Sequence, residues 1–240
     1  MPTFRCLSRL LWIVLLALGL ANCAVMDEAF VADNAAILTP PTTAQETTVE
    51  PPRAVAVNHF KRTKQLLTDR QQALVKEVYS AISQQPQDIN MMRLTSSVNA
   101  IQTYLSSTAP AAIPSMLFLA LGDGFFQLQQ TNDAVSAWQR SVSANQYNYF
   151  AHDRLAQAHR HRGEFVMAEQ HYNEAINAWS DFSSGYRNRG ILYDLYLGDK
   201  ARALDDYRQY KQLLTLAGQQ TREVDRWIKE MQVAVNMSSR

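Results

Sequence analysis

The stretch FLALGDGFFQLQQTNDAVSAWQRS, residues 118–141, returns 34 residues later as HDRLAQAHRHRGEFVMAEQHYNEA, residues 152–175. A third version, YRNRGILYDLYLGDKARALDDYRQY, covers residues 186–210 and is one residue longer. At the same place in each copy stands a small residue: Gly122, Ala156 or Gly190. A period of this length is typical of helical hairpins that stack into a solenoid.

The spacing of small and bulky residues within each copy predicts two antiparallel helices. Where two helix backbones approach closely only Gly or Ala fits, and a large side chain fills the space beside the contact. Ala134 and Ala168 mark the second helices of the first two copies, and Trp138 and Tyr172 follow them by four residues. We therefore expect these aromatic side chains, and their counterpart Tyr207, to be core residues.

The third copy departs from this spacing. Ala203 and Tyr207 follow their counterparts by 35 residues, and Arg189 stands where the first two copies have leucine. The longer spacing predicts one extra residue in the turn Leu197-Gly198-Asp199.

Together these residues resemble the tetratricopeptide-repeat family over residues 115–216. The resemblance implies an all-α fold, a tetratricopeptide-like helical-hairpin solenoid with three repeats at 115–148, 149–182 and 183–216. An unrelated helical bundle with accidental periodicity is the alternative.

Helical patterns also flank the repeats. Residues 59–114 predict an extra N-terminal helical pair, with a first helix from His59 to Pro86 and a second capped near Asp88. This pair is either a degenerate repeat or an unrelated hairpin, since Ala100, Tyr104 and Ser107 lie 34 residues before Ala134, Trp138 and Ser141. Residues 217–240 predict a C-terminal capping helix and tail, with an apolar face formed by Val224, Trp227, Ile228 and Met231.

The first residues of the chain predict export. Arg5 and Arg9 precede 12 apolar residues, Leu10 to Ala21, whereas a membrane-spanning helix needs about 20. The stretch ends in Leu20-Ala21-Asn22-Cys23, which resembles the bacterial lipobox. The resemblance implies that residues 1–22 are a lipoprotein signal peptide and that Cys23 becomes the lipidated amino terminus. Ordinary cleavage after Cys23 is the alternative, and Asn22 stands where the lipobox usually has Gly, Ala or Ser.

The residues after the lipobox predict where the chain is held. Ala24 rather than Asp follows Cys23, which in the familiar sorting rule of bacterial lipoproteins implies the outer membrane, with the domain facing the periplasm. Residues 23–58 are rich in Pro and Thr and predict a lipid-anchored flexible tether that spans roughly 30 Å. A shorter tether with an ordered element around Phe30 to Leu38 is the alternative. The only other cysteine, Cys6, leaves with the signal, so no disulfide forms within the mature chain.

Charge and composition exclude several functions. Without the signal the chain has 21 Lys and Arg against 22 Asp and Glu. Nucleic acids and anionic membrane surfaces both need a concentrated basic field, so we expect no nucleic-acid partner and membrane contact through the lipid anchor only.

Structural roles explain the candidate catalytic residues better than catalysis does. His152 and His159 share a helix face, but both occupy packing positions of the second repeat, so we expect no metal site there. Carboxylates gather around one turn and the helix after it, where capping and the helix dipole account for them: Asp194, Asp199, Asp205 and Asp206. The sequence has no glycine-rich phosphate loop and no nucleophile elbow. We therefore expect no enzyme and no cofactor.

Binding of another protein is the remaining function. In tetratricopeptide arrays the first helices of successive units line a concave groove, and the resemblance implies which residues face it here. They are Leu119, Asp123 and Phe126 in the first unit, Asp153, Gln157 and Arg160 in the second, and Arg187, Ile191 and Asp194 in the third. This mixture favours an envelope protein or peptide segment held by apolar contacts and charge-assisted hydrogen bonds. Leu119 and Asp123 do not match the Lys/Asn carboxylate clamp of chaperone-binding relatives.

The function that follows is a non-enzymatic interaction scaffold. The chain resembles outer-membrane tetratricopeptide lipoproteins that serve pilus or secretin assembly, motility or TonB-linked complexes. An adaptor that regulates or delivers a periplasmic enzyme, such as a peptidoglycan hydrolase, is the alternative. A periplasmic hydrolase would need a catalytic constellation that the sequence does not contain.

Overall fold

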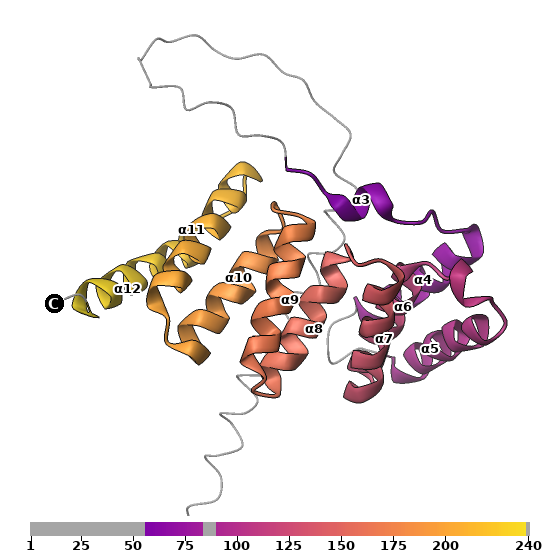
Figure 1. Cartoon of the computed structure of the whole chain (residues 1–240). Helices are drawn as coiled ribbons and strands as arrows, with labels where there is room; N and C mark the ends of the chain where they lie inside the picture. Colours follow the sequence, from indigo (N-terminus) through magenta and orange to yellow (C-terminus); the bar gives the residue numbers. More distant parts are fainter. Residues whose placement is uncertain (1–55, 84–89, 239–240) are drawn as a thin grey trace, which may run out of the picture.

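The computed structural model describes residues 56–83 and 90–238, which form a curved row of helices (Figure 1). The predictions for the signal peptide, for Cys23 and for the tether up to residue 55 lie outside the described residues. Within the described part of the chain, no helix combines the length and the apolar character needed to cross a membrane.

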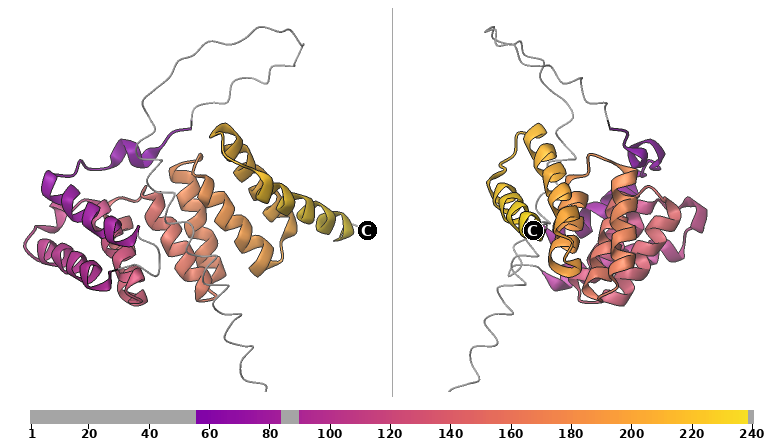
Figure 2. Two further views of the ribbon diagram at one scale, coloured as in Figure 1. Left: turned by 180° about the vertical axis from the view of Figure 1, so that it is seen from behind. Right: turned by 60° about the vertical axis from the view of Figure 1, so that its left-hand side comes forward.

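Each predicted unit contains one antiparallel helical hairpin. The pairs are α6 (Ser115–Gln127) with α7 (Thr131–Ala144), α8 (Tyr149–His161) with α9 (Phe165–Ala178), and α10 (Ser183–Ile191) with α11 (Lys200–Leu216). Successive hairpins stack, because α7 packs against α8 and α9 packs against α10 (Figure 2). The predicted all-α helical-hairpin solenoid is confirmed.

Small residues allow the two helices of each hairpin to approach closely. A Cβ atom at Gly122 would collide with the indole ring of Trp138. A Cβ atom at Gly190 would lie 2.7 Å from the ring of Tyr207, closer than real Cβ contacts allow. The bulky side chains beside these contacts, Trp138, Tyr172 and Tyr207, are all buried, as the repeat pattern predicts.

The extra residue of the third unit lies in a helix and not in the turn. After α10 the chain continues into a π-helical segment, η3 (Leu192–Leu197), which makes wider turns than an α-helix. The N–H of Asp199 then bonds to the carbonyl of Tyr193, six residues earlier, while the matching N–H of Glu164 bonds to the carbonyl of His159, five residues earlier. The prediction that placed the extra residue around Leu197, Gly198 and Asp199 is therefore corrected to the helix before that turn.

The segment predicted as one helix from His59 is divided in two. It forms a short helix, α3 (His59–Thr63), and a longer one, α4 (Asp69–Ile82). Thr68 starts α4 with a capping box, in which Thr68 and Gln71 each bond the other's backbone N–H. This competing helix start explains the break, while Pro86 lies outside the described residues.

The segment before α4 is attached to the repeats. Asn58, the last residue of the predicted tether, forms an isolated β-bridge with Trp179, after α9. Phe60 is buried in an aromatic cluster with Tyr149 and Phe182, with ring centroids 5.7 Å apart for Phe60 and Tyr149. The chain is therefore already held by the array before α4 begins.

Helices α4 and α5 (Met91–Ser106) pack against α6 at one end of the row, and η2 (Pro110–Ala112) links α5 to α6. The N-cap of α5 is Asn90, while Asp88 lies outside the described residues. Val78 of α4 and Val98 of α5 both reach Gly124 of α6. Ala100 and Ser107 match repeat positions in the sequence but are exposed, so α5 does not repeat the packing of α7.

The other end of the row is closed by α12 (Arg222–Ser238). Val224 and Met231 are buried, and the ring of Trp227 lies 5.3 Å from that of Tyr207. The helix covers the last hairpin with the apolar face that the sequence predicts.

The close contact inside the second hairpin can be tested with two leucine substitutions. Ala168 is fully buried beside Tyr172 and Leu192, while Ala201 is exposed on α11. Ala168→Leu should overpack the hairpin and lower the free energy of unfolding by about 1 to 3 kcal/mol. Ala201→Leu should change it by no more than about 0.5 kcal/mol. Thermal melts followed by circular dichroism measure both, and equal melting temperatures would contradict this packing.

Candidate protein-binding groove

The predicted groove residues come from the first helices of the three hairpins, α6, α8 and α10, and from η3, which continues α10. The structure separates them into two groups by burial. Partly or largely accessible are Phe126, Gln157, Arg160, Arg187, Ile191 and Asp194. Buried are Leu119, Asp123 and Asp153. The groove prediction therefore needs correction for three residues, each for a physical reason.

Leu119 and Asp123 are covered because α4 packs on α6. Leu119 is completely buried in the main core cluster with Val75 and Val78 of α4. Asp123 accepts a hydrogen bond of 3.2 Å from the hydroxyl of Tyr79, also on α4. In this conformation neither side chain can touch a partner, so the expectation that they face the groove is wrong.

Asp123 instead links the first two hairpins. Its Oδ1 accepts a hydrogen bond from the indole N–H of Trp138 at 3.0 Å and from Nε of Arg154 on α8 at 3.0 Å. A charge-assisted bond between nearly buried groups is stronger than a neutral one. We conclude that the Asp123–Arg154 pair fixes how α8 sits against α6.

Asp153 has the same role between the second and third hairpins. It accepts hydrogen bonds from Asn188 of α10 at 2.8 Å and from Gln157 at 2.7 Å, and Arg154 lies 3.6 Å away. Burial raises the pKa of the Asp153 carboxyl, and the charge of Arg154 and the two amide donors oppose that rise. Its oxygens are used inside the array, so the prediction that Asp153 contacts a partner is also wrong.

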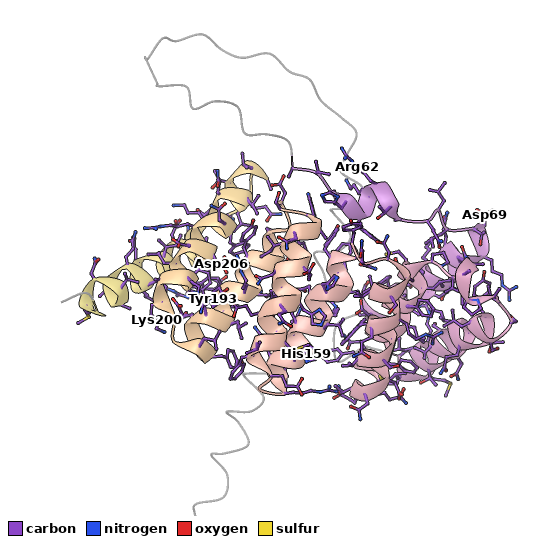
Figure 3. The ribbon with its side chains drawn as sticks, viewed as in Figure 1. Arg62, Asp69, His159, Tyr193, Lys200 and Asp206 are labelled. Atoms are coloured by element: carbon purple, nitrogen blue, oxygen red, sulfur yellow. The ribbon has the colours of Figure 1, made fainter. Side chains whose placement is uncertain are left out.

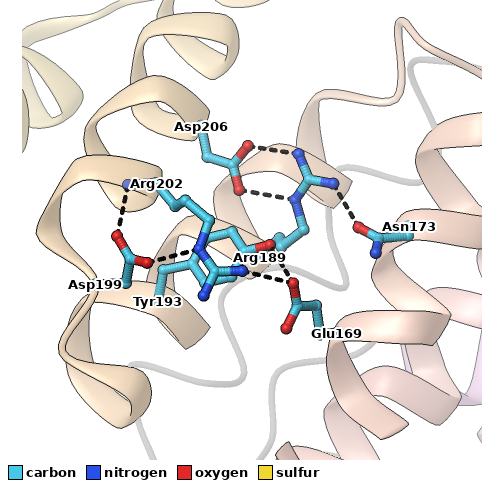
Figure 4. Close-up of polar contacts among 7 residues, drawn as sticks. All are labelled: Glu169, Asn173, Arg189, Tyr193, Asp199, Arg202 and Asp206. Atoms are coloured by element: carbon cyan, nitrogen blue, oxygen red, sulfur yellow. Dashed lines mark hydrogen bonds and ion pairs between the residues drawn. The ribbon is translucent and has the colours of Figure 1, made fainter. Parts of the chain in front are cut away.

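In the third hairpin a charged network replaces an apolar contact (Figure 4). Arg189, which stands in a leucine position of the repeat, forms a bidentate pair with Asp206 of α11 at 2.9 and 2.7 Å. It also donates to Asn173 of α9 at 2.5 Å, which ties the second hairpin to the third. Burial raises the pKa of the Asp206 carboxyl, and Arg189 opposes that rise. The polar contacts of Arg189 therefore compensate for the apolar contact that leucine makes in the first two repeats.

The other carboxylates near this turn bond within the third hairpin, and Asp199 has the capping role that the sequence predicts. Asp199 caps α11 by accepting from the backbone N–H of Arg202. Asp194 pairs with Lys200 at 2.6 Å and accepts from the hydroxyl of Tyr207 at 3.2 Å. The side chain of Asp194 is only 13% exposed and its two oxygens are already bonded, so it offers little to a partner. Figure 3 shows Tyr193, Lys200 and Asp206 gathered at this hairpin.

The remaining accessible residues combine two arginines with apolar groups. The guanidinium of Arg160 lies 5.6 Å from the ring centre of Tyr196, and that of Arg187 lies 5.8 Å from the ring of Trp227. Such cation–π contacts hold a guanidinium in place without neutralising its charge. Tyr196 and Trp227 were not predicted to belong here, and no repeat signal could have found them, because they lie on η3 and α12.

A histidine cluster lies between α8 and α9. Nε2 of the buried His152 must donate to the carbonyl of Gln146 at 2.9 Å, so in the neutral ring Nδ1 is free to accept from Nδ1 of His171 at 3.1 Å. His171 in turn stacks on His159, with ring centroids 5.3 Å apart. The two predicted packing histidines thus pack against a third that the repeat pattern did not identify.

The rings of His152 and His171 favour their neutral forms. Burial and the neighbouring charges of His152 and His159 lower the pKa of His171 to about 4. Burial also lowers the pKa of His152. Across the described ranges, no three His, Cys, Asp or Glu side chains are arranged to hold a metal ion.

Comparison with known proteins concerns the fold. No family model matches the sequence, and no curated protein is significantly similar to it. A tetratricopeptide repeat protein from Parabacteroides merdae ATCC 43184 superimposes with a TM-score of 0.54 at 15% identity, over 70% of this chain and 62% of that one. The chain has the tetratricopeptide-repeat fold.

A second tetratricopeptide-like match agrees with the first. MamA of AMB-1 aligns with a TM-score of 0.51 at 14% identity, over 68% of this chain and 86% of that one. Identities this low show a shared fold and leave the partner of the tetratricopeptide array to be argued from its own surface.

The histidine cluster predicts a pH-dependent stability. An unfolded histidine has a pKa near 6.5, so between about pH 6.5 and 4 the unfolded chain binds more protons than the folded one. Stability should therefore fall as the pH drops through this range. His171→Asn removes the titrating ring, and its melting temperature should decline by several degrees less than that of the wild type between pH 7 and 4.5. His59→Asn, remote on α3, should decline like the wild type; equal declines in all three proteins would refute the assignment.

Proposed function

We propose that this protein is a non-enzymatic protein–protein interaction scaffold, a bacterial outer-membrane lipoprotein whose tetratricopeptide array docks envelope proteins. It assists the assembly or positioning of a multiprotein complex of the pilus and secretin, motility or TonB-linked type. Cys23 carries the lipid anchor, and the array faces the periplasm. The partner is an envelope protein or peptide segment that contacts the accessible residues of α8 and α10.

One observation supports docking on this face above all. The packing positions of the repeats are filled and the interior carboxylates are paired, while Arg160 and Arg187 lie on aromatic rings and, among the described residues, form no ion pair. Charged groups that add little to the fold but stay accessible favour binding of an oppositely charged partner. Phe126, which is 41% exposed, and the half-buried Ile191 add apolar area.

A regulatory or delivery adaptor for a periplasmic enzyme, such as a peptidoglycan hydrolase, is the second candidate. The same surface would serve it, because only the identity of the docked protein differs. The proteins recovered in the experiment below decide between these functions.

The lipid anchor is tested by Cys23→Ala. Without the thiol no acyl chain can be attached, so labelling with radioactive palmitate should disappear and the protein should move to the soluble periplasmic fraction. Cys6→Ala, within the predicted signal, is the matched control and should leave labelling unchanged. Membrane association of Cys23→Ala equal to that of the wild type would refute the lipoprotein proposal.

Docking is tested by reversing both arginines, Arg160→Glu together with Arg187→Glu. Because neither side chain fills a packing position, helicity should stay close to that of the wild type. Arg160→Gln together with Arg187→Gln, which adds no negative charge beside the buried Asp153, should also keep the melting temperature. Losing a charge-assisted contact costs about 1.5 to 3 kcal/mol, roughly ten- to a hundredfold in affinity. Crosslinking and recovery from membranes should therefore lose specific envelope proteins that the wild type retains.

The control for this experiment reverses two exposed arginines elsewhere, Arg140 on α7 and Arg208 on α11. It should recover the same proteins as the wild type. If the wild type itself recovers no specific envelope protein, the scaffold proposal fails.

A further inference from the structure

Arg160 differs from the other interior arginines of the array. Arg154 and Arg189 form close pairs with Asp123 and Asp206, at 3.0 and 2.7 Å. Nε and Nη1 of Arg160 are also shielded from solvent, yet among residues 56–83 and 90–238 they have no hydrogen-bond partner. Buried donors are almost always satisfied in folded proteins, and an unsatisfied one costs free energy. This guanidinium therefore contributes little to the fold through hydrogen bonds.

A second unsatisfied group lies beside it. Tyr172 is completely buried, and its hydroxyl likewise has no hydrogen-bond partner in the described part of the chain. The charge of Arg160 acts on the pKa of both Tyr172 and Asp153, which places the three groups in one neighbourhood. Among the described residues Asp153 forms no hydrogen bond or ion pair with Arg160, and its oxygens accept from Asn188 and Gln157. The donors of Arg160 and Tyr172 therefore lie close together without a hydrogen-bond acceptor among the described residues.

The rim of this neighbourhood is apolar and exposed. The π-helical segment η3 carries Leu195, Tyr196 and Leu197, which are 70%, 42% and 38% exposed. The ring of Tyr196 lies over Arg160 and 5.4 Å from Phe165 at the start of α9. A half-exposed tyrosine on the surface can change rotamer, and this would open the guanidinium to a ligand.

We infer that Arg160 is the anchor for a carboxylate of the docked protein segment, with an apolar residue of that segment packed beside it against η3 and the start of α9. A carboxylate supplies the acceptors that Nε and Nη1 lack and forms a planar, bidentate pair with a guanidinium. A phosphate would bring about two negative charges close to Asp153, so a single carboxylate fits better. This inference rests on the proposed scaffold function and names the chemistry of its partner.

The free protein provides the first test. Arg160→Met keeps an unbranched apolar stem and removes the unsatisfied donors, so the full chain should melt at the wild-type temperature or above it. Arg189→Met is the matched control and should melt lower, because it leaves Asp206 buried without its partner. If Arg160→Met melts as low as Arg189→Met, the guanidinium is a structural group and the inference is overturned.

Binding provides the second test, with three tripeptide probes: acetyl-Leu-Glu-Leu-amide, acetyl-Leu-Gln-Leu-amide and acetyl-Leu-Gln-Leu with a free carboxyl group. The Nε–H resonance of Arg160 in the ¹⁵N-labelled full chain is identified by its loss in Arg160→Met. A carboxylate-bearing peptide should shift it to saturation at roughly ten- to a hundredfold lower concentration than the fully amidated glutamine peptide. If the glutamate peptide has the stronger effect, the natural partner presents an acidic side chain. If the peptide with the free carboxyl group has the stronger effect, the partner presents its chain terminus.

The control for binding is Arg162→Met, which removes an exposed arginine two residues away that donates to Asn132. It should bind the acidic peptides like the wild type, whereas Arg160→Met should bind them no better than the amidated glutamine peptide. Equal shifts by all three probes, or no shift, overturn the inference. The scaffold function is judged separately, by the envelope proteins that the wild type recovers.

Discussion

The close contact between the two helices of each hairpin is the constraint on which the rest of the structure depends. Gly122 and Gly190 leave no room for a Cβ atom, because Trp138 and Tyr207 fill the space against them. Once this distance is fixed, each hairpin presents a flat face that one unit cannot bury alone. The next hairpin must cover it, and α12 must cover the last. Overpacking one contact therefore disturbs the array beyond a single unit.

This constraint also explains how much the sequence could predict. Close contacts are local and recur every 34 residues, so the hairpins, their order and the buried Trp138 were predictable. The burial of Leu119 was not, because it depends on how α4 packs against α6, and α4 lacks the repeat spacing. Asp153 was misassigned for a similar reason, since its partner Asn188 belongs to another unit. Repeat register predicts which way a side chain points and not what covers it.

Electrostatics divides the array into a closed interior and an open face. Inside, each carboxylate that links two hairpins has a cation or amide donor within hydrogen-bond distance, as Asp123 has Arg154 and Asp153 has Asn188. Such pairs fix the register between units more than they add stability, because burying charge costs free energy. Arg160 departs from this rule with donors that no described residue satisfies. Natural proteins keep such local departures mainly where they serve function, which is why the proposed binding site is placed there.

The attachment of α3 bears on how the array would be presented in the proposed lipoprotein. Asn58 bridges Trp179 and Phe60 is buried against Tyr149, so the chain meets the array at the second hairpin before it reaches α4. A tether from Cys23 would then pull on the middle of the row and not on its end. The aromatic cluster would in this way hold the binding face at a fixed orientation to the end of the tether.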